Sequence, residues 1–574
     1  MYGLSKNLCY LGLCAACCAP LIGSVGCMGP ILRQQSPESA LADDVDSATT
    51  FISDVAHPYG MNFLKVEAVA LVTGLNGTGG DPPPTSQRAA LLNDMNRREV
   101  DHPNEVLASP NTALVLVRGF LRPGIQSGDR FDIEVRTPSR SDTTSLRGGN
   151  LLETRLSETA VLENQIRSGH LMAVAKGSVL VDPSADADDA AHATQGRVLR
   201  GAIATKSRNM GLVLDHERQS IRVSQQVGMA INNRFHSFVE GSQKGVATPK
   251  TDEFVELVLH PRYKDNVGRY MRVVRSIAIA ESQMQLQERL KLLRNQLLDP
   301  VTSATAVLRL EAIGNDEAIA VLKEGIAEDD PEVRFYSAEA LAYLDETAAV
   351  APLARAAREE PAFRVHALAA LSAMDDGAAY DELRSLLELK SAETRYGAFR
   401  ALTSMSPSDP FLRGEDFDGK FTYHVLDVPG QPMIHATSSH RPEVVLFGTD
   451  HQLRLPLVLD AGPKILVNGL SGAKIKVSHF GETTQQRVVS TDVNAVIRAV
   501  VDLGGTYPDV VQLLQQANES GALQSRFRVN ALPESGREIV RSRAAPSNES
   551  LAEQPDLSAY DLGTPEPELF GKKN

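Results

Sequence analysis

One glycine-rich segment has the composition of a phosphate-binding loop, the run Leu75-Asn76-Gly77-Thr78-Gly79-Gly80-Asp81. Such loops hold phosphate with backbone N–H groups and normally lead into a helix through a Lys-Ser or Lys-Thr pair. No such pair follows here, and the run Pro82-Pro83-Pro84 prevents a helix from starting where the anion would lie. The segment therefore predicts a turn and no nucleotide site.

Acid–base and metal chemistry have equally little support. Asp129 and Asp132 are close in sequence but out of phase in a strand pattern, so we expect a turn cap and a solvated side chain. His435, His440 and His451 come nearest to a metal cluster, yet they lack ligand spacing and are expected to be exposed loop residues. With no Gly-x-Ser-x-Gly elbow and no mature Cys–His pair, we expect no enzyme, no cofactor and no metal site.

The five cysteines all lie at the start of the chain, at positions 9, 14, 17, 18 and 27. Residues 1–27 form a short apolar segment after Lys6, which predicts a secretory signal and not a membrane-spanning helix. The run Ser24-Val25-Gly26-Cys27 resembles the lipobox of bacterial lipoproteins, in which Cys27 would be acylated and would anchor the chain to the outer membrane. Ordinary cleavage nearby is the alternative, and both place the mature chain outside the cytoplasm.

Composition describes an ordinary soluble protein of several domains. The chain has 574 residues, of which 42% are hydrophobic and 23% charged. A formal charge of −14 argues against a nucleic-acid partner, because phosphate contacts need a basic face. The absence of Trp leaves few stacking surfaces. We expect about three folded units, each with its own core.

The pattern of the chain predicts an α+β fold, with mixed α/β regions split by an all-α helical solenoid. The expected divisions are a signal segment (1–27), a flexible tether (28–50), an α+β region (51–280), a connecting helix (281–298), helical repeats (299–408), a second mixed region (409–531) and a disordered tail (532–574).

In the first region, alternation at Phe131, Ile133 and Val135 predicts a half-buried strand. Ile221 and Val223 are expected to form another strand, followed by an amphipathic helix through Phe235. In the second region, a helix over residues 492–501 is expected after a cap at Ser490 or Thr491, and Pro508 is expected to open another helix.

A repeat separates these regions. Asp330-Pro331-Glu332-Val333-Arg334 returns as Glu360-Pro361-Ala362-Phe363-Arg364, and more weakly as residues 391–395 with Arg395 at the same place. The near-constant period of about thirty residues resembles short HEAT repeats, in which paired helices stack because one pair cannot bury its own face. Pro331 and Pro361, at the head of the first two copies, suit the first turn of a helix.

Two motifs in the first region resemble the bacterial flagellar P-ring protein family. They are a proline–glycine–aspartate strand and a Ser-Leu-Arg-Gly-Gly loop, which place the family residues at Pro123, Gly124, Gly128, Asp129, Ser145, Leu146, Arg147, Gly148 and Gly149. Residues 196–203 and the helices from Thr491 to Leu523 also resemble that family. In the loop we expect the glycines to supply positive φ, and Arg147 to pair with a carboxylate either on the same chain or across a subunit boundary.

The resemblance implies a building block that polymerises in the periplasm into a homo-oligomeric ring around the flagellar rod, near the peptidoglycan and the L-ring proteins. Three features depart from the family: the HEAT-like insert, the lipidation motif at Cys27, and Ala522 where many members carry a cysteine. The insert implies a further protein partner, so the rival interpretation is an envelope lipoprotein adaptor that binds through its solenoid. A HEAT-type lyase is a weaker rival, because no reactive constellation accompanies the repeats.

Overall fold

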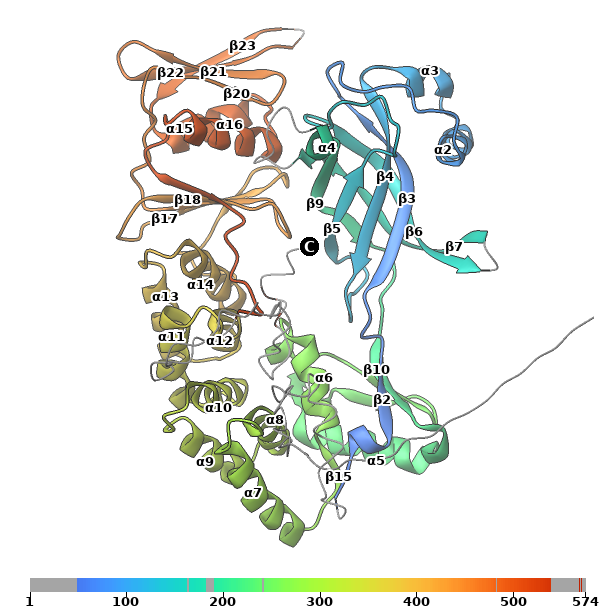
Figure 1. The fold of residues 1–574 in the computed structure, drawn as a ribbon, viewed down its shortest axis with the longest axis vertical. Coiled ribbons are helices and arrows are strands. Elements are labelled where there is room, and N and C mark those ends of the chain that lie inside the picture. The colour runs from blue at the N-terminus through green and yellow to red at the C-terminus, as the bar shows by residue number, and fades with distance from the viewer. Residues whose placement is uncertain are drawn as a thin grey trace, which may run out of the picture.

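The computed structural model describes residues 49–162, 165–181, 190–239, 242–481, 483–537, 567 and 569. The chain has four parts: a β-barrel, a small α+β module, a helical solenoid and a C-terminal region. The C-terminal region lies beside the barrel, so the last part of the chain returns to the first (Figure 1). The mixed α+β class is confirmed. The predicted signal segment, Cys27 and residues 28–48 of the predicted tether lie outside the described residues.

The barrel is a seven-stranded antiparallel sheet that closes on itself because β5 pairs with both β4 and β9. Its strands are β3 (Leu64–Thr73), β4 (Thr112–Leu121), β5 (Arg130–Arg136), β6 (Asn150–Leu162), β7 (Gln165–Ser178), β8 (Leu180–Val181) and β9 (Gln195–Ala204). Inward side chains such as Val66, Val117 and Ile133 fill the interior, as the alternation in β5 predicts. Helices α2 (Ser86–Arg97) and α3 (Pro103–Ala108) cover part of the outside through a core with Leu71 and Leu114.

The module follows the barrel and combines a four-stranded sheet with two helices. The sheet holds β2 (Ala56–Tyr59), β10 (Met210–Leu214), β13 (Ala247–Pro249) and β14 (Phe254–Leu257), and the helices are α5 (Ile221–Arg234) and α6 (Val267–Arg275). The prediction of a strand at Ile221 and Val223 is wrong, because both belong to α5. Ser220 caps that helix by accepting the Val223 N–H at 3.2 Å, and the four-residue step from Val227 to Ile231 buries its inner face.

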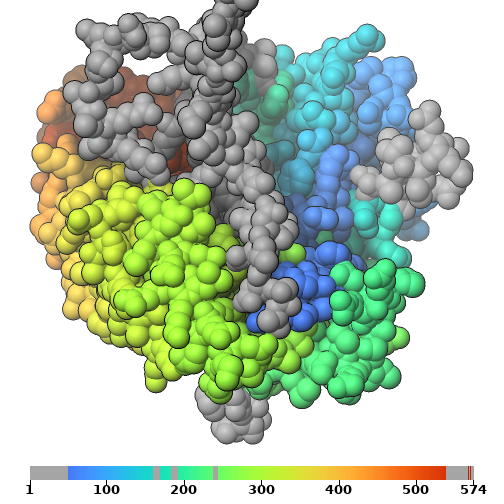
Figure 2. All heavy atoms as spheres, turned by 60° about the horizontal axis from the view of Figure 1, so that its bottom comes forward, coloured from blue at the N-terminus to red at the C-terminus, as the bar shows by residue number. Residues whose placement is uncertain are grey.

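The start of the described chain lies between the module and the solenoid. Strand β1 (Thr50–Phe51) pairs with β15 (Ala278–Ala280), and blue atoms of this first segment separate the green module from the yellow-green solenoid in Figure 2. The Phe51 ring faces the guanidinium groups of Arg289 and Arg309, at 5.4 and 5.2 Å from its centroid. Both arginines lie on solenoid helices, so this segment ties the two parts together.

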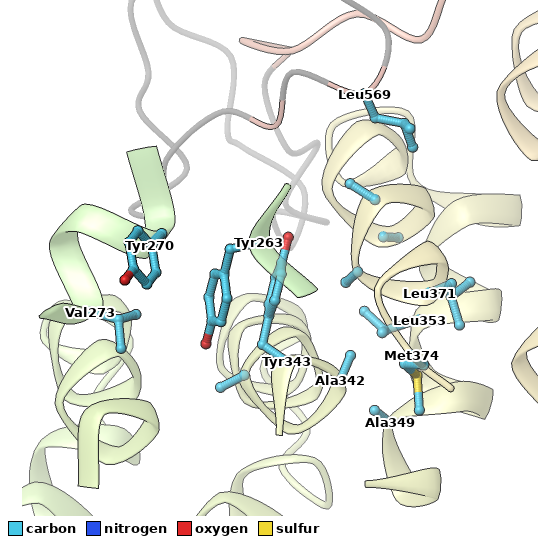
Figure 3. Close-up of a cluster of buried hydrophobic side chains, with 14 of the residues drawn as sticks. Tyr263, Tyr270, Val273, Ala342, Tyr343, Ala349, Leu353, Leu371, Met374 and Leu569 are labelled. Atoms are coloured by element: carbon cyan, nitrogen blue, oxygen red, sulfur yellow. The ribbon is translucent and has the colours of Figure 1, made fainter. Parts of the chain in front are cut away.

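The solenoid is a stack of paired helices that continues from the connecting helix. Its helices are α7 (Gln283–Leu297), α8 (Ser303–Ile313), α9 (Asp316–Gly325), α10 (Pro331–Tyr343), α11 (Val350–Glu359), α12 (Arg364–Ser372), α13 (Gly377–Leu386) and α14 (Ala392–Met405). Small residues such as Ala338, Ala367 and Ala398 let the inner helices pack closely into one core. Figure 3 shows part of this core, with Leu353 and Leu371 labelled.

The repeated arginine has a definite structural task. Arg334, Arg364 and Arg395 each donate to a backbone carbonyl at or just beyond the end of the preceding helix, those of Glu328, Ala357 and Leu387, at 2.7, 3.0 and 2.7 Å. At Ala357 and Leu387 the cation satisfies a carbonyl that the ending helix leaves unpaired and complements the negative end of its dipole.

The repeated proline plays a less uniform part than the sequence suggests. Pro331 opens α10 as expected, and Asp330 caps that helix. The expectation is wrong for Pro361, which stands in the turn before α12, because that helix begins only at Arg364.

The C-terminal region is a sandwich with two helices between two sheets (Figure 1). One sheet contains β16 (Glu415–Asp416), β17 (Thr422–Leu426), β18 (Met433–Ala436), β19 (Glu443–Phe447) and β24 (Arg526–Val529); the other contains β20 (Val458–Ala461), β21 (Ile465–Leu470), β22 (Lys474–His479) and β23 (Gln485–Ser490). The helices are α15 (Val493–Asp502) and α16 (Tyr507–Glu519). The cap of α15 is Asp492, which accepts two backbone N–H groups, and not Ser490 or Thr491 as predicted.

Candidate functional site: the motif loops and two buried junctions

The proline–glycine–aspartate motif forms the turn from β4 to β5. Gly124 and Gly128 have φ of +68° and +95°, which glycine adopts without strain, and Pro123 is buried between them and β4. The Asp129 carboxylate accepts the Gln126 N–H at 3.0 Å and so closes the turn, as expected for a cap. The turn is also held to the end of β9, because the Gly128 N–H donates to Ala204 O at 2.8 Å.

The Ser-Leu-Arg-Gly-Gly loop lies against the glycine-rich segment at residues 75–81. The Thr78 hydroxyl donates to Ser145 O at 2.9 Å, so two segments singled out from the sequence meet in space. Leu146 is fully buried, and the Arg147 N–H donates to the Ser145 hydroxyl at 3.2 Å. These contacts make the glycine-rich segment a structural turn that supports the loop.

The two glycines of this loop are required for different reasons. Gly148 has φ of +72°, as predicted, and a Cβ placed on it would lie 2.8 Å from Pro463 Cγ. Gly149 does not have positive φ, so the expectation is wrong there; a Cβ would instead lie 2.5 Å from Val72 Cγ1 in the barrel core. Gly148 is thus a close contact between the barrel and the C-terminal region, because Pro463 belongs to the β20–β21 turn.

The barrel meets the C-terminal region at two further points. Asp132 accepts the backbone N–H of Arg200 at 2.8 Å through one oxygen and that of His440 through the other. Leu180 and Leu199 join the core of the C-terminal region. Asp132 is half-buried and its two hydrogen bonds are exposed, so the side chain stays in contact with solvent while it bridges two distant parts of the chain.

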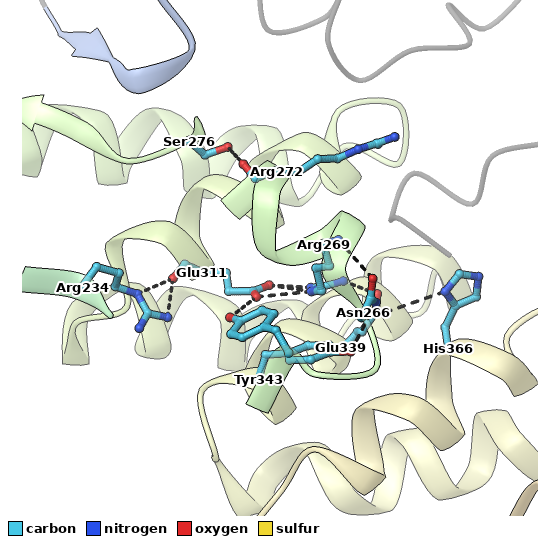
Figure 4. Close-up of polar contacts among 10 residues, drawn as sticks. Arg234, Asn266, Arg269, Arg272, Ser276, Glu311, Glu339, Tyr343 and His366 are labelled. Atoms are coloured by element: carbon cyan, nitrogen blue, oxygen red, sulfur yellow. Dashed lines mark hydrogen bonds and ion pairs between the residues drawn. The ribbon is translucent and has the colours of Figure 1, made fainter. Parts of the chain in front are cut away.

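A buried ionic cluster joins the module to the solenoid (Figure 4). Arg269 of α6 contacts Glu311 of α8 at 2.5 Å and Glu339 of α10 at 2.7 Å, and all three side chains have no exposed surface. The Tyr263 hydroxyl donates to Glu311 at 2.6 Å, and His366 Nδ1 lies 3.9 Å from Glu339. One cation therefore faces two carboxylates in a site closed to water.

The two carboxylates of this cluster keep Arg269 in its charged form. Burial alone would lower the pKa of Arg269, but Glu311 and Glu339 outweigh it and raise that pKa. Burial, followed by the charge of Glu311, raises the pKa of Tyr263 well above its ordinary value. The tyrosine thus stays a neutral donor, and the arrangement is suited to fastening helices together.

A second buried cluster joins the solenoid to the C-terminal region. Glu443 of β19 accepts a hydrogen bond from the Tyr396 hydroxyl of α14 and lies 3.4 Å from Arg400 of the same helix. His435 of β18 stacks on Tyr396 with ring centroids 3.7 Å apart, and its Nε2 accepts the Ala531 N–H at 3.0 Å. Burial lowers the pKa of His435 to about 3, so its ring is neutral.

The histidine prediction is wrong for His435 and His451, which are 0% and 1% exposed. His451 is held by Ser525 Oγ at 2.8 Å and by Gly448 O at 3.1 Å, while His440 lies in the loop before β19. Among the described residues, no group of three or more His, Cys, Asp and Glu side chains is placed to hold a metal ion. In the same part of the chain no helix has the length and apolar character to cross a membrane.

Sequence reasoning missed the residues of both junctions. A signal was present, because Glu311 and Glu339 each stand between apolar residues on helices that are otherwise buried. A charged residue in such a position requires a partner. The partner Arg269 lies on another part of the chain, and nothing in the local pattern identifies it.

Two segments of the chain match known families. Residues 52–288 match the family model of the flagellar P-ring protein, and residues 286–365 match HEAT repeats. Among similar proteins, the flagellar P-ring protein of Bradyrhizobium sp. (strain BTAi1) is 28% identical over 42% of this chain and 63% of its own length. That of Campylobacter lari is 26% identical over 38% of this chain and 61% of its own length, and that of Thermotoga maritima 29% identical over 41% and 68%. The chain thus spans somewhat under two thirds of the first two relatives. The resemblance to the P-ring family with HEAT repeats beside it is confirmed.

Proposed function

We propose that this chain, whose residues 52–288 form a flagellar P-ring domain, is a structural subunit of the flagellar basal-body P ring. The observation that carries the proposal is the family match itself, which begins directly after β1, covers the barrel and the module, and ends in α7. The P-ring family is structural, and the motif residues of this chain close turns and fill contacts between its parts.

The subunits assemble in the periplasm into a closed ring that surrounds the rod as a bushing for rotation and motility. A closed ring needs a heterologous interface, in which one patch on each subunit meets a different patch on the next. Such a ring transmits load only if each protomer is stiff. The buried clusters at Arg269 and Glu443 support this requirement, because they fasten the solenoid to the parts on both sides.

The solenoid serves as a spacer within the protomer and offers its outer helices α9, α11 and α13 to a further envelope protein. Side-chain bonds between successive repeats stiffen this spacer. They join Gln287 to Glu317 at 2.7 Å and Thr347 to Asp376 at 2.6 Å, near the repeat period of the sequence. The L-ring proteins and peptidoglycan are the other proposed contacts, and acylation at Cys27 is the proposed link to the outer membrane.

The test combines imaging with genetics. Cells that lack the gene should fail to swim in soft agar, and negative-stain images of their basal bodies should lack the ring. The full-length gene should restore both, and the exported product should form closed rings in isolation. Swimming cells with intact rings in the absence of this chain would overturn the proposal.

Point variants on the outside of the solenoid distinguish a ring subunit from the rival interpretation, an adaptor lipoprotein. Deleting the whole solenoid would break both buried clusters, so the deletion cannot distinguish these two interpretations. Arg355→Glu changes the charge of an exposed position on α11 without touching either cluster. Rings that still form, with loss of only one bound protein, support a ring subunit with a docking face; loss of the rings contradicts it.

A further inference from the structure

The four-stranded sheet of the C-terminal region is covered on one face only. Helices α15 and α16 pack against that face, where Leu459, Val467 and Val477 are buried (Figure 1). Successive strands are paired in register, so one row of neighbouring side chains crosses the opposite face, namely Val458, Asn468, Lys476 and Val488. The two valines of this row are 67% and 56% exposed, so the described residues leave the outer face open.

This outer face is apolar and basic. Phe480 extends it at one end, because its N–H donates to Lys464 O at 2.8 Å and continues the register of β21 and β22; the side chain is 52% exposed. Three lysines accompany the apolar residues, Lys464, Lys474 and Lys476, against one carboxylate, Asp460. Within the described residues, none of these lysines forms an ion pair. Exposed apolar side chains gathered on one face indicate a binding surface, the basic sheet face.

The solenoid carries a row of the opposite charge. Its helices alternate in direction, so the turns inside the four helix pairs lie along one edge of the stack. An exposed carboxylate stands at the same place of each pair, at Asp299, Asp329, Glu359 and Glu388, in steps of 30, 30 and 29 residues. In the part of the chain that the structure describes, no cation pairs with any of the four. We call these residues the acidic row.

The spacing of the two surfaces matches. Neighbouring repeats of a solenoid lie about 10 Å apart, so Asp329 and Glu388, two repeats apart, are separated by about 20 Å. Lys464 lies opposite Phe480, six positions along β22 from Lys474, which also corresponds to about 20 Å. Two lysines at the ends of the basic sheet face can therefore meet two carboxylates of an acidic row at the same time.

The two surfaces belong to different parts of one protomer. The sheet of β16–β19 and β24, together with helices α15 and α16, lies between the basic sheet face and the solenoid (Figure 1). Neither set of charges is paired within the described residues of its own copy. The matching acidic row must therefore come from another copy.

We propose that the basic sheet face of one copy binds the acidic row of the next copy. Each copy then offers one patch of each kind, which is the heterologous contact that a closed ring requires. This inference rests on the proposed ring and names its subunit contact. The outer helices of the solenoid stay available to a further protein, because the acidic row occupies only the edge formed by the turns.

Charge reversal tests the contact in the full chain by sedimentation velocity. Lys474→Glu with Lys476→Glu makes the sheet face acidic, and Asp329→Lys with Glu359→Lys makes the row basic. Either double variant alone should associate about 100-fold more weakly than the wild type, because like charges then face each other. Lys206→Glu with Lys291→Glu, at exposed lysines outside both surfaces, is the matched control and should associate as the wild type does.

Mixing the two defective variants provides the decisive measurement. One has two acidic patches and the other two basic patches, so an equal mixture should associate in alternation with an affinity near that of the wild type. Restored association also shows that both variants are folded. A mixture that stays monomeric would overturn the proposal. Association should weaken as salt rises, because salt screens exposed charges.

The remaining outcomes separate this contact from the ring itself. Rings that form equally well from the wild type and both double variants would overturn the contact and leave the ring in place. A wild type that never associates would overturn the ring and the contact with it. Vesicles of phosphatidylglycerol test an anionic membrane as the partner: binding that Lys474→Glu with Lys476→Glu abolishes, without any change in association between copies, would also overturn the proposal.

Discussion

Asp132 accepts a hydrogen bond from the backbone amide of His440, a residue 308 positions further along the chain. The second oxygen of the same carboxylate accepts the Arg200 N–H, so one side chain holds the end of the barrel and a loop of the C-terminal region. This contact and that of Gly148 with Pro463 both join the barrel to the C-terminal region. The first and last parts of the chain are thereby joined without the solenoid.

Asp132→Ala should loosen this contact, because two backbone N–H groups lose a charged acceptor. The expected cost is about 1–3 kcal/mol in the free energy of unfolding. Hydrogen exchange at His440 and Arg200 should rise, whereas Asp101→Ala, at an exposed aspartate of the same region, should leave both amides unchanged. Unchanged exchange in the Asp132 variant would show that the contact is absent in solution.

Gly148→Ala isolates the contact with Pro463 if it is compared with Gly128→Ala. Both glycines have positive φ, but a Cβ at Gly128 meets no heavy atom within 4 Å. We expect Gly128→Ala to cost about 1–2 kcal/mol for the backbone alone, and Gly148→Ala about 1–3 kcal/mol more for the crowded contact. Urea unfolding measures both, and combining Gly148→Ala with Pro463→Ala should recover the excess. Equal costs for the two glycine variants would contradict the contact.

The cluster at Arg269 should behave as a buried ion site, in which loss of one partner is worse than loss of all. Arg269→Met leaves two carboxylates without their cation and should cost about 3–5 kcal/mol. Adding Glu311→Gln and Glu339→Gln should recover part of that loss, because neutral amides need no counter-charge. Arg294→Met, at a side chain 56% exposed beside Glu324, should cost less than about 1 kcal/mol. Chemical denaturation followed by circular dichroism separates these cases.

His435 makes stability depend on pH in a defined direction. Burial lowers its pKa to about 3 in the folded chain, so the unfolded chain takes up a proton first as pH falls. This part of the stability is present above about pH 6.5 and is lost progressively between there and pH 3. Thermal unfolding across that range should show a shallower decline in His435→Phe than in the wild type. His57→Phe, at a side chain 70% exposed, should keep the wild-type slope. An equal slope in His435→Phe and in the wild type would contradict the assignment.

The sequence predicts the elements well where the pattern is local. The strand at Phe131 appears as expected because alternation depends on neighbouring residues alone, and the helices at Arg334 and Arg364 appear because the thirty-residue repeat can be seen in the sequence itself. The barrel was not predictable in this way, because closure depends on the pairing of β5 with β9.

The errors have physical causes that can be named. His435 stands among Met433, Ile434 and Ala436, and this apolar setting favours a buried strand more than an exposed loop. Ile221 and Val223 alternate like a strand, but Ser220 provides a helix cap at the right place. Tertiary partners such as His440 for Asp132 lie beyond any local pattern.

The repeated arginine gives the last prediction. Arg364 Nε donates to Ala357 O at 3.0 Å, and its Nη1 lies 3.3 Å from Glu393, the partner of Arg537. Arg364→Leu should therefore cost about 1.5–3 kcal/mol, because a charge-assisted bond to a helix end is lost and a buried carbonyl stays unpaired. Arg355→Leu, at an exposed position on α11, provides the matched control and should cost less than about 0.5 kcal/mol.

Arg364→Lys separates the two contributions of this side chain. A lysine keeps the charge but lacks the planar fork, so it should recover only part of the loss. Because the same arginine also contacts Glu393, hydrogen exchange should rise both at the end of α11 and in residues 532–537. A cost confined to α11, with unchanged exchange in residues 532–537, would show that the repeat arginine caps its helix without supporting the segment that follows β24.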